Sequence, residues 1–259
     1  MLLIKSITPI PESEDKIFYI SSFLLDRYAQ LTKKKEVKTL NSLQNYNNYA
    51  IISKEVFMVL ENKLGIVESA ELAREEERIS KTKALELFEK GILDSLEAGK
   101  FSSLAKIHKH LFDDIYPFAG EVRDVNLAKG NFRFAPVMYL KPALEHIDNM
   151  PQTTFDEIID KYVEMNVAHP FREGNGRSTR IWLDLILKKE IGKVIDWSKV
   201  DKEDYLLSME RSPIKSIEIK ELLRQALTSD INDKVVYMEG IDASYSYEGY
   251  FIYRTEDMA

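Results

Sequence analysis

The sequence predicts an all-α protein that carries one small β-hairpin. Apolar residues recur at intervals of three and four through most segments after Glu68, which is the spacing of amphipathic helices. A different pattern appears in Val122–Phe134, where apolar and polar residues alternate on both sides of a glycine-containing turn. The chain contains no cysteine, so neither a disulfide framework nor a thiol nucleophile is expected.

Composition and charge exclude several classes of protein. The 259 residues suffice for one large domain, or for a domain with an extension. The net charge of −7, with no dominant basic stripe, argues against a nucleic-acid-binding protein. No apolar run approaches the length of a membrane span, and the apolar start Met1–Ile4 is too short for a signal peptide. We therefore expect a soluble cytoplasmic protein.

Residues 1–57 differ in character from the rest of the chain. A helix is expected over Ile17–Leu31, whereas Thr39–Asn48 is polar, rich in asparagine and typical of weakly ordered sequence. Three interpretations stay open: an added helical segment, a disordered extension, or translated upstream sequence. The third has a specific basis, because Lys54–Val56 can be encoded by a purine-rich stretch that resembles a ribosome-binding site just before Met58.

Helices account for most of the remaining chain, in which we expect a main domain over residues 58–240 and a C-terminal segment over residues 241–259. Thr154–Glu157 has the sequence of a capping box at the start of a helix. The segment Arg177–Lys189 is apolar nearly all round, which predicts a central, buried helix. The other expected elements are helices over Glu68–Gly99, from Ser102, over Pro142–Met150, Phe155–His169, Trp197–Ser212 and Ile217–Thr228, and a connector over Asn232–Glu239.

The hairpin is expected to turn at Lys129–Asn131, with apolar strand residues at Val125, Leu127, Phe132 and Phe134. An isolated hairpin is marginally stable and must lean on the helical body. Two interpretations stay open. Its exposed edge could pair with an extended segment of a partner protein, or the hairpin could be purely structural.

The residues with the clearest chemical potential gather in HPFREGNGRSTR, His169–Arg180. Pro170 disfavours a helical backbone at His169, so the preceding helix is expected to end there. The Gly-Asn-Gly turn allows a tight bend, and a helix that starts near Arg177 directs free N–H groups and its positive dipole end to the same place. Such a turn binds anions, most often phosphate. Arg177 and Arg180 share one face of the first helical turn.

Two simpler interpretations compete with an anion site. An ordinary loop with a surface histidine does not explain why all these features converge. Zinc binding by His169 and Glu173 lacks a third nearby ligand, and zinc sites usually draw on several His or Cys residues. With an ordinary pKa of about 6.5, His169 is suited to act as a general base at neutral pH. The other histidines are expected to be packing or surface residues: His108, His110 and His146.

A second short pattern lies near the C-terminus, in Gly240–Gly249. Ser244 and Glu248 are four residues apart and share a face of a short helix that Gly249 is placed to end. A helix this short is not stable alone and must dock against the domain. The alternative is an ordinary aromatic tail.

These two patterns resemble the Fic family. HPFREGNGRSTR matches the family motif H-x-F-x-[DE]-G-N-G-R-x-x-R at every fixed position, and SYSYEG (Ser244–Gly249) matches its inhibitory motif [ST]-x-x-x-E-[GN]. The similarity extends from about Ser69 to Tyr250 and is closest to short bacterial members with a C-terminal inhibitory helix. Two positions depart from close relatives: Ser246 replaces a common tyrosine, and Pro213 stands where a polar residue can occur.

The resemblance implies an all-α Fic core in which the hairpin is a flap that holds the target's modified residue. It also implies that AMP is transferred from ATP to a hydroxyl group of a target protein. In that activity His169 is the base and Glu173 binds Mg²⁺; Ser244 and Glu248 inhibit, and Tyr245 accepts AMP in self-modification. The implied nucleotide contacts are Lys129, Gly130, Asn131, Phe132, Gly174, Asn175, Gly176, Arg177, Arg180 and Tyr205.

Other functions stay open from the sequence. One is hydrolytic removal of AMP from a modified protein, with Glu248 activating water. Another is a nucleotide-sensing module without enzymatic activity, although an intact His169 with both arginines argues against it. Transfer of phosphate or phosphocholine is disfavoured because the motif keeps its glutamate and arginines. The expected partners are ATP, Mg²⁺ and a target protein that the sequence does not name, with a homo-oligomer as one possibility and no nucleic acid or membrane.

Overall fold

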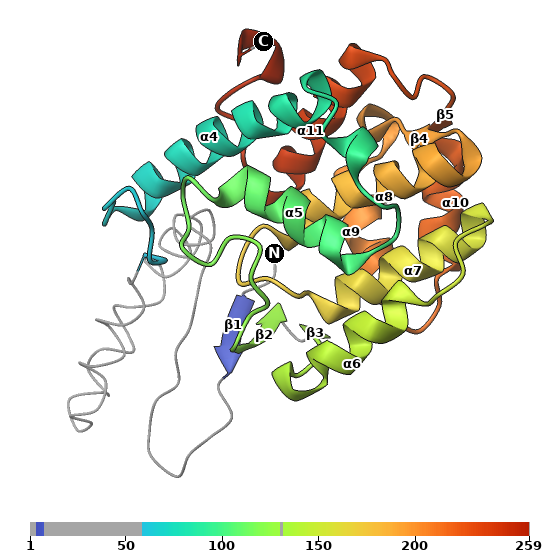
Figure 1. The fold of residues 1–259 in the computed structure, drawn as a ribbon, viewed down its shortest axis with the longest axis horizontal. Coiled ribbons are helices and arrows are strands. Elements are labelled where there is room, and N and C mark those ends of the chain that lie inside the picture. Colours follow the sequence, from blue (N-terminus) through green and yellow to red (C-terminus); the bar gives the residue numbers. More distant parts are fainter. Residues whose placement is uncertain (1–3, 8–58, 130–131, 259) are drawn as a thin grey trace, which may run out of the picture.

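The computed structural model describes residues 4–7, 59–129 and 132–258. Within this part the protein is mainly helical, as the sequence predicts, and has two small antiparallel sheets (Figure 1). The described α-helices are α4 (Ser69–Glu89), α5 (Phe101–Phe112), α6 (Val137–Asp148), α7 (Phe155–Ala168), α8 (Asn175–Ile191), α9 (Lys202–Arg211), α10 (Ile217–Gln225) and α11 (Lys234–Glu248). Short 3-10 turns are Leu93–Ser95, Trp197–Lys199 and Thr255–Met258.

Helix α8 is the central element, with α5, α7 and α11 packed against it. The prediction from its apolar sequence is confirmed, because Trp182, Leu183 and Ile186 are fully buried. The capping box at the start of α7 is also confirmed: the Thr154 hydroxyl accepts from the Glu157 N–H, and the Glu157 carboxylate accepts from the Thr154 N–H. Two rigid helices, α7 and α8, therefore flank the His169–Arg180 loop.

The connector predicted over Asn232–Glu239 is wrong, because α11 begins at Lys234 and has 15 residues. The Asp233 side chain caps it by accepting from the N–H groups of Val235 and Val236. Gly240 lies inside the helix, where a Cβ would be 3.3 Å from the Trp197 ring. The expected boundary between residues 240 and 241 therefore falls within one continuous helix.

Helix α6 begins at Val137 rather than at Pro142, which lies inside the helix. The Val137 N–H donates to the side-chain oxygen of Asn126, 2.8 Å away in the hairpin. This cap comes from a residue that is distant in sequence, so the local pattern around Pro142 did not reveal it.

The hairpin is formed by β2 (Asn126–Lys129) and β3 (Phe132–Arg133), within the predicted stretch. The other edge of β2 is not free: it pairs antiparallel with β1 (Ile4–Ile7), with Ser6 opposite Leu127. In this sheet, of order β1-β2-β3, β1 and β3 are the edge strands. A second sheet pairs Val194–Ile195 (β4) with Leu227–Thr228 (β5), strands that are too short to show a period. The helix predicted over Ile217–Thr228 ends at Gln225, so its last two residues form β5 instead.

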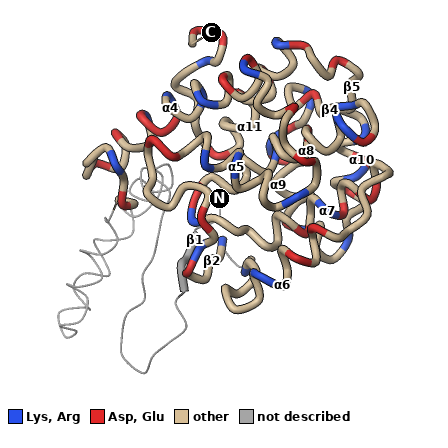
Figure 2. The backbone as a smooth tube through the Cα atoms, in the orientation of Figure 1, with Lys and Arg blue, Asp and Glu red and all other residues tan. Residues whose placement is uncertain are grey.

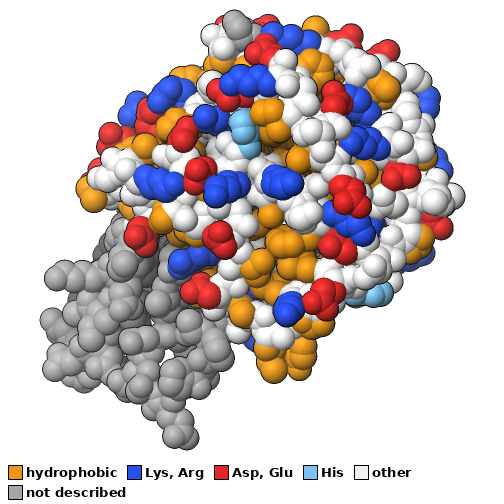
Figure 3. Space-filling view, in the orientation of Figure 1, with side chains coloured by type: hydrophobic (Ala, Val, Ile, Leu, Met, Phe, Trp, Pro, Cys, Tyr) orange, Lys and Arg blue, Asp and Glu red, His pale blue; other side chains and the backbone are white. Residues whose placement is uncertain are grey.

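Several predictions fall outside the described residues: the helix over Ile17–Leu31, the polar stretch Thr39–Asn48, the start at Met58, and the contacts of Gly130 and Asn131. Between residues 59 and 258, apart from 130–131, no helix is both long and apolar enough to cross a membrane. Basic and acidic residues are interspersed along the backbone in Figure 2. The face in Figure 3 shows an apolar area around α6, where Met138 and Tyr139 are exposed.

Candidate active site

The loop between α7 and α8 holds His169 at the C-terminal end of α7. Its backbone is left-handed, with φ of 49° and ψ of 62°, rather than extended as expected for a residue before proline. The geometry follows from the helix end, because the His169 N–H still bonds to the Met165 carbonyl (3.0 Å) while the chain reverses. Of the described residues other than glycine, His169 alone has a positive φ.

The glycine turn begins α8. Gly174 has a φ of 73°, and a Cβ there would lie 2.4 Å from the Phe112 ring, so only glycine fits. Asn175 closes the loop by accepting from the Phe171 N–H (2.8 Å) and donating to the Phe171 carbonyl (2.7 Å). The Asn175 side chain was expected to donate to phosphate, but in this structure both of its polar atoms are engaged with Phe171.

His108 supports the same loop from α5. It is fully buried, stacks on Phe171 with ring centroids 3.8 Å apart, and lies 2.8 Å from the Glu173 carbonyl through Nε2. Its Nδ1 accepts from the Gly120 N–H, so Nε2 must carry the proton that bonds to Glu173. Burial lowers the pKa of His108 to about 3 and keeps the ring neutral. The expectation of a packing role agrees with this position.

The His169 imidazole stacks on Phe134 of the hairpin, with ring centroids 3.6 Å apart. Burial, followed by the positive charges of Arg123 and Lys129, lowers its pKa to about 3, whereas the sequence suggested an ordinary value. The imidazole is therefore neutral at pH 7, which is the form that accepts a proton. Lys129 and Phe132, two of the expected nucleotide contacts, lie on the facing ends of β2 and β3.

Arg177 is fully buried and lies among three carboxylates. Its Nη1 is 2.6 Å from Glu76, its Nη2 is 3.2 Å from Glu173 and its Nε is 3.0 Å from Glu248. Glu76 belongs to α4 and is also bonded by the hydroxyl groups of Tyr116 and Tyr250. Glu76 lies outside both sequence motifs and was not predicted to be part of the site.

The carboxylate of Glu173, which is expected to bind Mg²⁺, lies beside Arg177. Burial, followed by the charge of Glu76, raises the pKa of its carboxyl to about 7, while Arg177 acts in the opposite direction. One of its oxygens accepts from the Gly174 N–H (3.1 Å). No group of three or more His, Cys, Asp and Glu side chains suited to a metal occurs in the described residues. One carboxylate fits Mg²⁺, which is commonly held by one or two carboxylates together with substrate phosphates.

Helix α11 docks on Arg180 through the two residues of the second motif. The Ser244 hydroxyl accepts from Nε (2.6 Å) and its carbonyl from Nη2 (2.9 Å). Glu248 lies 2.8 Å from the same Nη2, so its carboxylate bridges Arg177 and Arg180. Burial would raise the pKa of Glu248, but the two arginines lower it overall and keep it ionised.

Two tyrosines of the expected site are enclosed in this docked arrangement. Tyr205 is 2% exposed and stacks on Tyr247 of α11, with ring centroids 5.0 Å apart. Tyr245 is fully buried, and the charged groups of Lys81 and Arg177 each lie 5.3 Å from its ring centroid. Its hydroxyl can therefore receive a modification only when α11 leaves.

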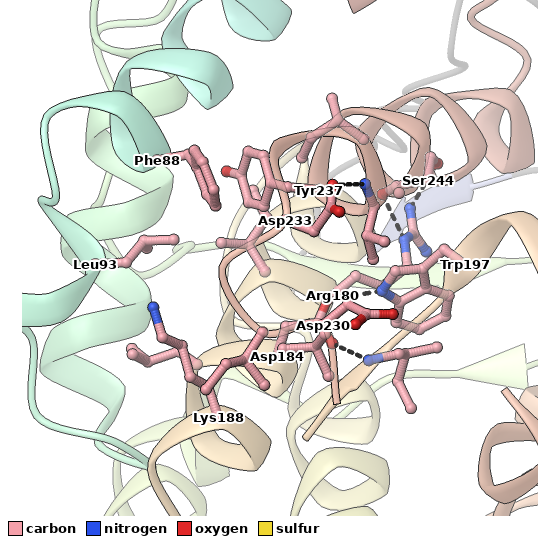
Figure 4. Close-up of a pocket in the computed structure, with 18 residues that line it drawn as sticks. Phe88, Leu93, Arg180, Asp184, Lys188, Trp197, Asp230, Asp233, Tyr237 and Ser244 are labelled. Carbon is pink, nitrogen blue, oxygen red and sulfur yellow. Dashed lines mark hydrogen bonds between the residues drawn. The ribbon is translucent and has the colours of Figure 1, made fainter. Parts of the chain in front are cut away.

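A pocket lies beside the contact between α8 and α11, with Arg180 and Ser244 in its lining (Figure 4). His169 and Glu173 do not line it. It is largely apolar, with Phe88, Trp197 and Tyr237 in its wall. Asp184 at its floor accepts from the Ile195 N–H and the Trp197 indole N–H, each at 2.8 Å, and burial raises its pKa to about 7. This carboxyl holds the loop that supports α11.

A cluster of charged side chains, in which Glu77 and Lys81 are buried, joins the chain after α11 to α4. Glu77 accepts from the N–H groups of Ile252 and Tyr253, and Lys81 pairs with Glu77 (3.1 Å) and Asp242 (2.9 Å). The Thr255 hydroxyl donates to Asp242, 3.0 Å away. We call Glu77, Lys81, Asp242 and residues 252–255 the tail clasp. It fixes α11 from the C-terminal side of Glu248.

The helical domain thus carries a glycine-containing loop at the N-terminal end of a buried helix, beside a neutral histidine. The Fic/DOC family model matches residues 100–187, which include this loop. Protein adenylyltransferase VbhT of Bartonella schoenbuchensis is 33% identical over 205 residues, which is 71% of this chain and 40% of that protein. A probable protein adenylyltransferase of Sinorhizobium fredii, y4lH, is 30% identical over 166 residues, 60% of this chain and 83% of that protein. The chain belongs to the Fic/DOC family.

Solved structures support the fold. BepC of Bartonella tribocorum, crystallised with AMPPNP, aligns with a TM-score of 0.54 and 20% identity over 66% of this chain and 96% of that chain. A Fic domain of Bartonella quintana with bound ADP aligns with a TM-score of 0.54 and 20% identity over 69% of this chain and 93% of that chain. The predicted helical Fic fold is confirmed.

Proposed function

We propose that the chain is a protein adenylyltransferase, which transfers AMP from ATP to a Ser, Thr or Tyr hydroxyl of a target protein and releases diphosphate. The observation that carries the proposal is the arrangement of a neutral His169, a glycine turn and two buried arginines around one helix N-terminus. The names of the relatives favour transfer over the hydrolytic and nucleotide-sensing alternatives. A cytoplasmic location, where ATP is available, is part of the proposal.

In the proposed reaction the acceptor oxygen attacks the α-phosphorus of ATP, and the bond from that phosphorus to the bridging oxygen breaks. The hydroxyl proton passes to the imidazole of His169. The bound phosphate charge favours the protonated imidazole, so the base strengthens when substrate is present. N–H groups at the start of α8, together with Arg177 and Arg180, neutralise the phosphates. Mg²⁺ bound to Glu173 would add positive charge against the phosphate oxygens.

The proposal includes inhibition by Glu248. The negatively charged Glu248 carboxylate contacts both arginines, which are the groups proposed to bind the phosphates. It also lies over the glycine turn, where a Cβ on Gly176 would be 2.3 Å from its oxygen. The phosphates of ATP must displace this carboxylate from Arg180 to align for transfer. Self-modification at Tyr245 would follow release of α11.

The test compares the natural chain, Glu248→Gly, and Glu248→Gly with His169→Ala, each incubated with Mg²⁺, cell lysate and ATP labelled at the α-phosphate. We expect label on proteins with Glu248→Gly, little with the natural chain and none with the double variant. A parallel reaction with γ-labelled ATP should give no label, which separates AMP transfer from phosphate transfer. Nucleotide binding without α-label transfer in any protein would reject the enzyme and favour a nucleotide sensor.

A further inference from the structure

Arg123 lies outside both sequence motifs, yet it joins the hairpin to the His169 loop. Its side chain is buried at 2% exposure. The guanidinium donates to four backbone carbonyls: Val125 (2.6 Å), Ala135 (2.5 Å), Ala168 (3.1 Å) and His169 (2.7 Å). The Arg123 side chain thus donates both to residues that flank the hairpin and to residues at the end of α7. The proposed reaction must bring these two segments together.

The four acceptor carbonyls lie at the base of the hairpin and at the C-terminal end of α7. Val125 and Ala135 flank the hairpin on either side, whereas Ala168 and His169 form the end of α7. Two backbone bonds link the same pieces, from the Arg123 N–H to the Pro170 carbonyl (2.8 Å) and from the Ala135 N–H to the Val167 carbonyl (2.9 Å). The base of the hairpin is therefore anchored to the catalytic loop, close to His169, whose backbone has a positive φ.

Arginine is suited to this role by its planar fork of five N–H donors. Lysine has one compact ammonium group, which cannot reach four carbonyls in two directions. A buried charge costs free energy unless it is well hydrogen-bonded. Burial lowers the pKa of Arg123 to about 10, so the side chain stays charged at neutral pH.

We propose that Arg123 is a positioning residue for AMP transfer: it fixes the hairpin, which would hold the acceptor, at a set distance from the His169 imidazole. The inference rests on the proposed function, since it concerns the same reaction. Arg123 also acts on the imidazole by charge. The charged groups that influence the imidazole are Arg123 and Lys129, which oppose its protonation, and Glu248, which favours it.

The experiment uses Arg123→Lys and Arg123→Gln in the Glu248→Gly background, with Arg224→Lys as the control. Arg224 is a half-exposed arginine on α10 that pairs with Asp156. With both Arg123 variants we expect transfer to a protein acceptor to fall by roughly tenfold to a hundredfold, as for reacting groups misplaced by about 1 Å, while ATP affinity is kept. The Arg224→Lys control should keep both the rate of transfer and the ATP affinity.

Two further measurements do not depend on activity. The Ala135 amide should exchange its hydrogen faster in both Arg123 variants, while amides in α8 keep their protection. By nuclear magnetic resonance, Arg123→Gln should raise the pKa of His169, because a positive charge near the imidazole is removed. A folded protein that lacks Arg123 but keeps normal transfer and normal Ala135 exchange would overturn the inference. If Arg123→Gln does not fold, Arg123→Lys, which keeps the charge, decides.

The two proposals fail in different ways. If the Glu248→Gly parent itself transfers no AMP, the proposed function is rejected. Hydrogen exchange at Ala135 and the titration of His169 would then still show whether Arg123 couples the hairpin to the loop. If the parent is active and the Arg123 variants lose ATP affinity as much as transfer, Arg123 is a general structural residue and the positioning role is rejected.

Discussion

The catalytic loop, His169–Arg180, and helix α11 meet at the same arginines but are held in place differently. The turn within the loop is shaped by bonds between residues four apart, such as Asn175 with Phe171 and Ser178 with Gly174, while His108 and Arg123 support the loop from other segments. Helix α11 depends on partners that are 64 to 68 residues away on α8, and on tail-clasp bonds to α4 that span 161 to 176 residues. We infer that substitutions and conditions disturb inhibition more readily than the geometry of the loop.

The largest effect should come from the loop itself. His169→Ala in the Glu248→Gly background should lower AMP transfer by about 10²–10⁴, the usual contribution of a general base. ATP binding should persist, because the glycine turn and the arginines are unchanged. Transfer of α-label and nucleotide affinity are measured separately. Near-normal transfer would remove His169 from the role of base.

Release of α11 should have the next largest effect. Glu248→Gly frees Arg177 and Arg180 and should raise transfer by about tenfold or more, since each step of about 1.4 kcal/mol is worth tenfold. Glu239→Gly is the matched control, because it places the same helix-weakening residue at an exposed position of α11. Equal activation by both variants would mean that weakening of the helix, and not loss of the carboxylate, is responsible.

The tail clasp should have a smaller effect. Thr255→Val keeps the shape of the side chain but removes its hydrogen bonds to Asp242 and to the Met238 carbonyl. A loss of about 1 kcal/mol in docking would raise transfer by no more than roughly fivefold. Thr228→Val, which removes a surface hydrogen bond to Asp230, is the control. Full activation by Thr255→Val would show that the tail clasp, rather than the bridge to the arginines, dominates inhibition.

The smallest change concerns pH. The pKa of His169 lies near 3, so its imidazole remains neutral from pH 8 down to about pH 5. Its nuclear magnetic resonance signals should therefore not titrate in this range in the nucleotide-free protein. Because the folded-state pKa is depressed, protonation of His169 should oppose folding only as the pH falls below its ordinary pKa. A midpoint near pH 6.5 would contradict the buried, positively charged surroundings of the ring.

The contrast between local and long-range contacts also explains which elements the sequence could predict. The helices α7 and α8, the capping box at Thr154 and the glycine turn follow from residues close in the chain, and the structure contains them. The roles assigned to the individual residues of the site remain predictions. The start of α11 was missed, because residues 234–239 fall in the predicted connector and the helix packs at Gly240 against Trp197, which is distant in the sequence.

Glu76 and Arg123 could not be assigned from local pattern, because their partners come from other segments. A partial signal existed for Glu76. It lies on a buried stripe of α4 at helical spacing with Leu72, Ser80 and Ala84, where a carboxylate is out of place without a cation. Arg123 gave no such signal, since its acceptors are backbone carbonyls, including that of His169, 46 residues away.

The separation of Arg180 from Glu248 also orders events during synthesis. The 68 residues between them take roughly 3–14 s to translate at about 5–20 residues per second. Both arginines therefore leave the ribosome before the carboxylate that neutralises them, and the tail clasp is completed last. We expect each nascent chain to pass through a short period with an open anion site. Ribosome-bound chains that expose residues up to 240 and are supplied with α-labelled ATP would reveal that period as nucleotide binding stronger than that of the finished protein.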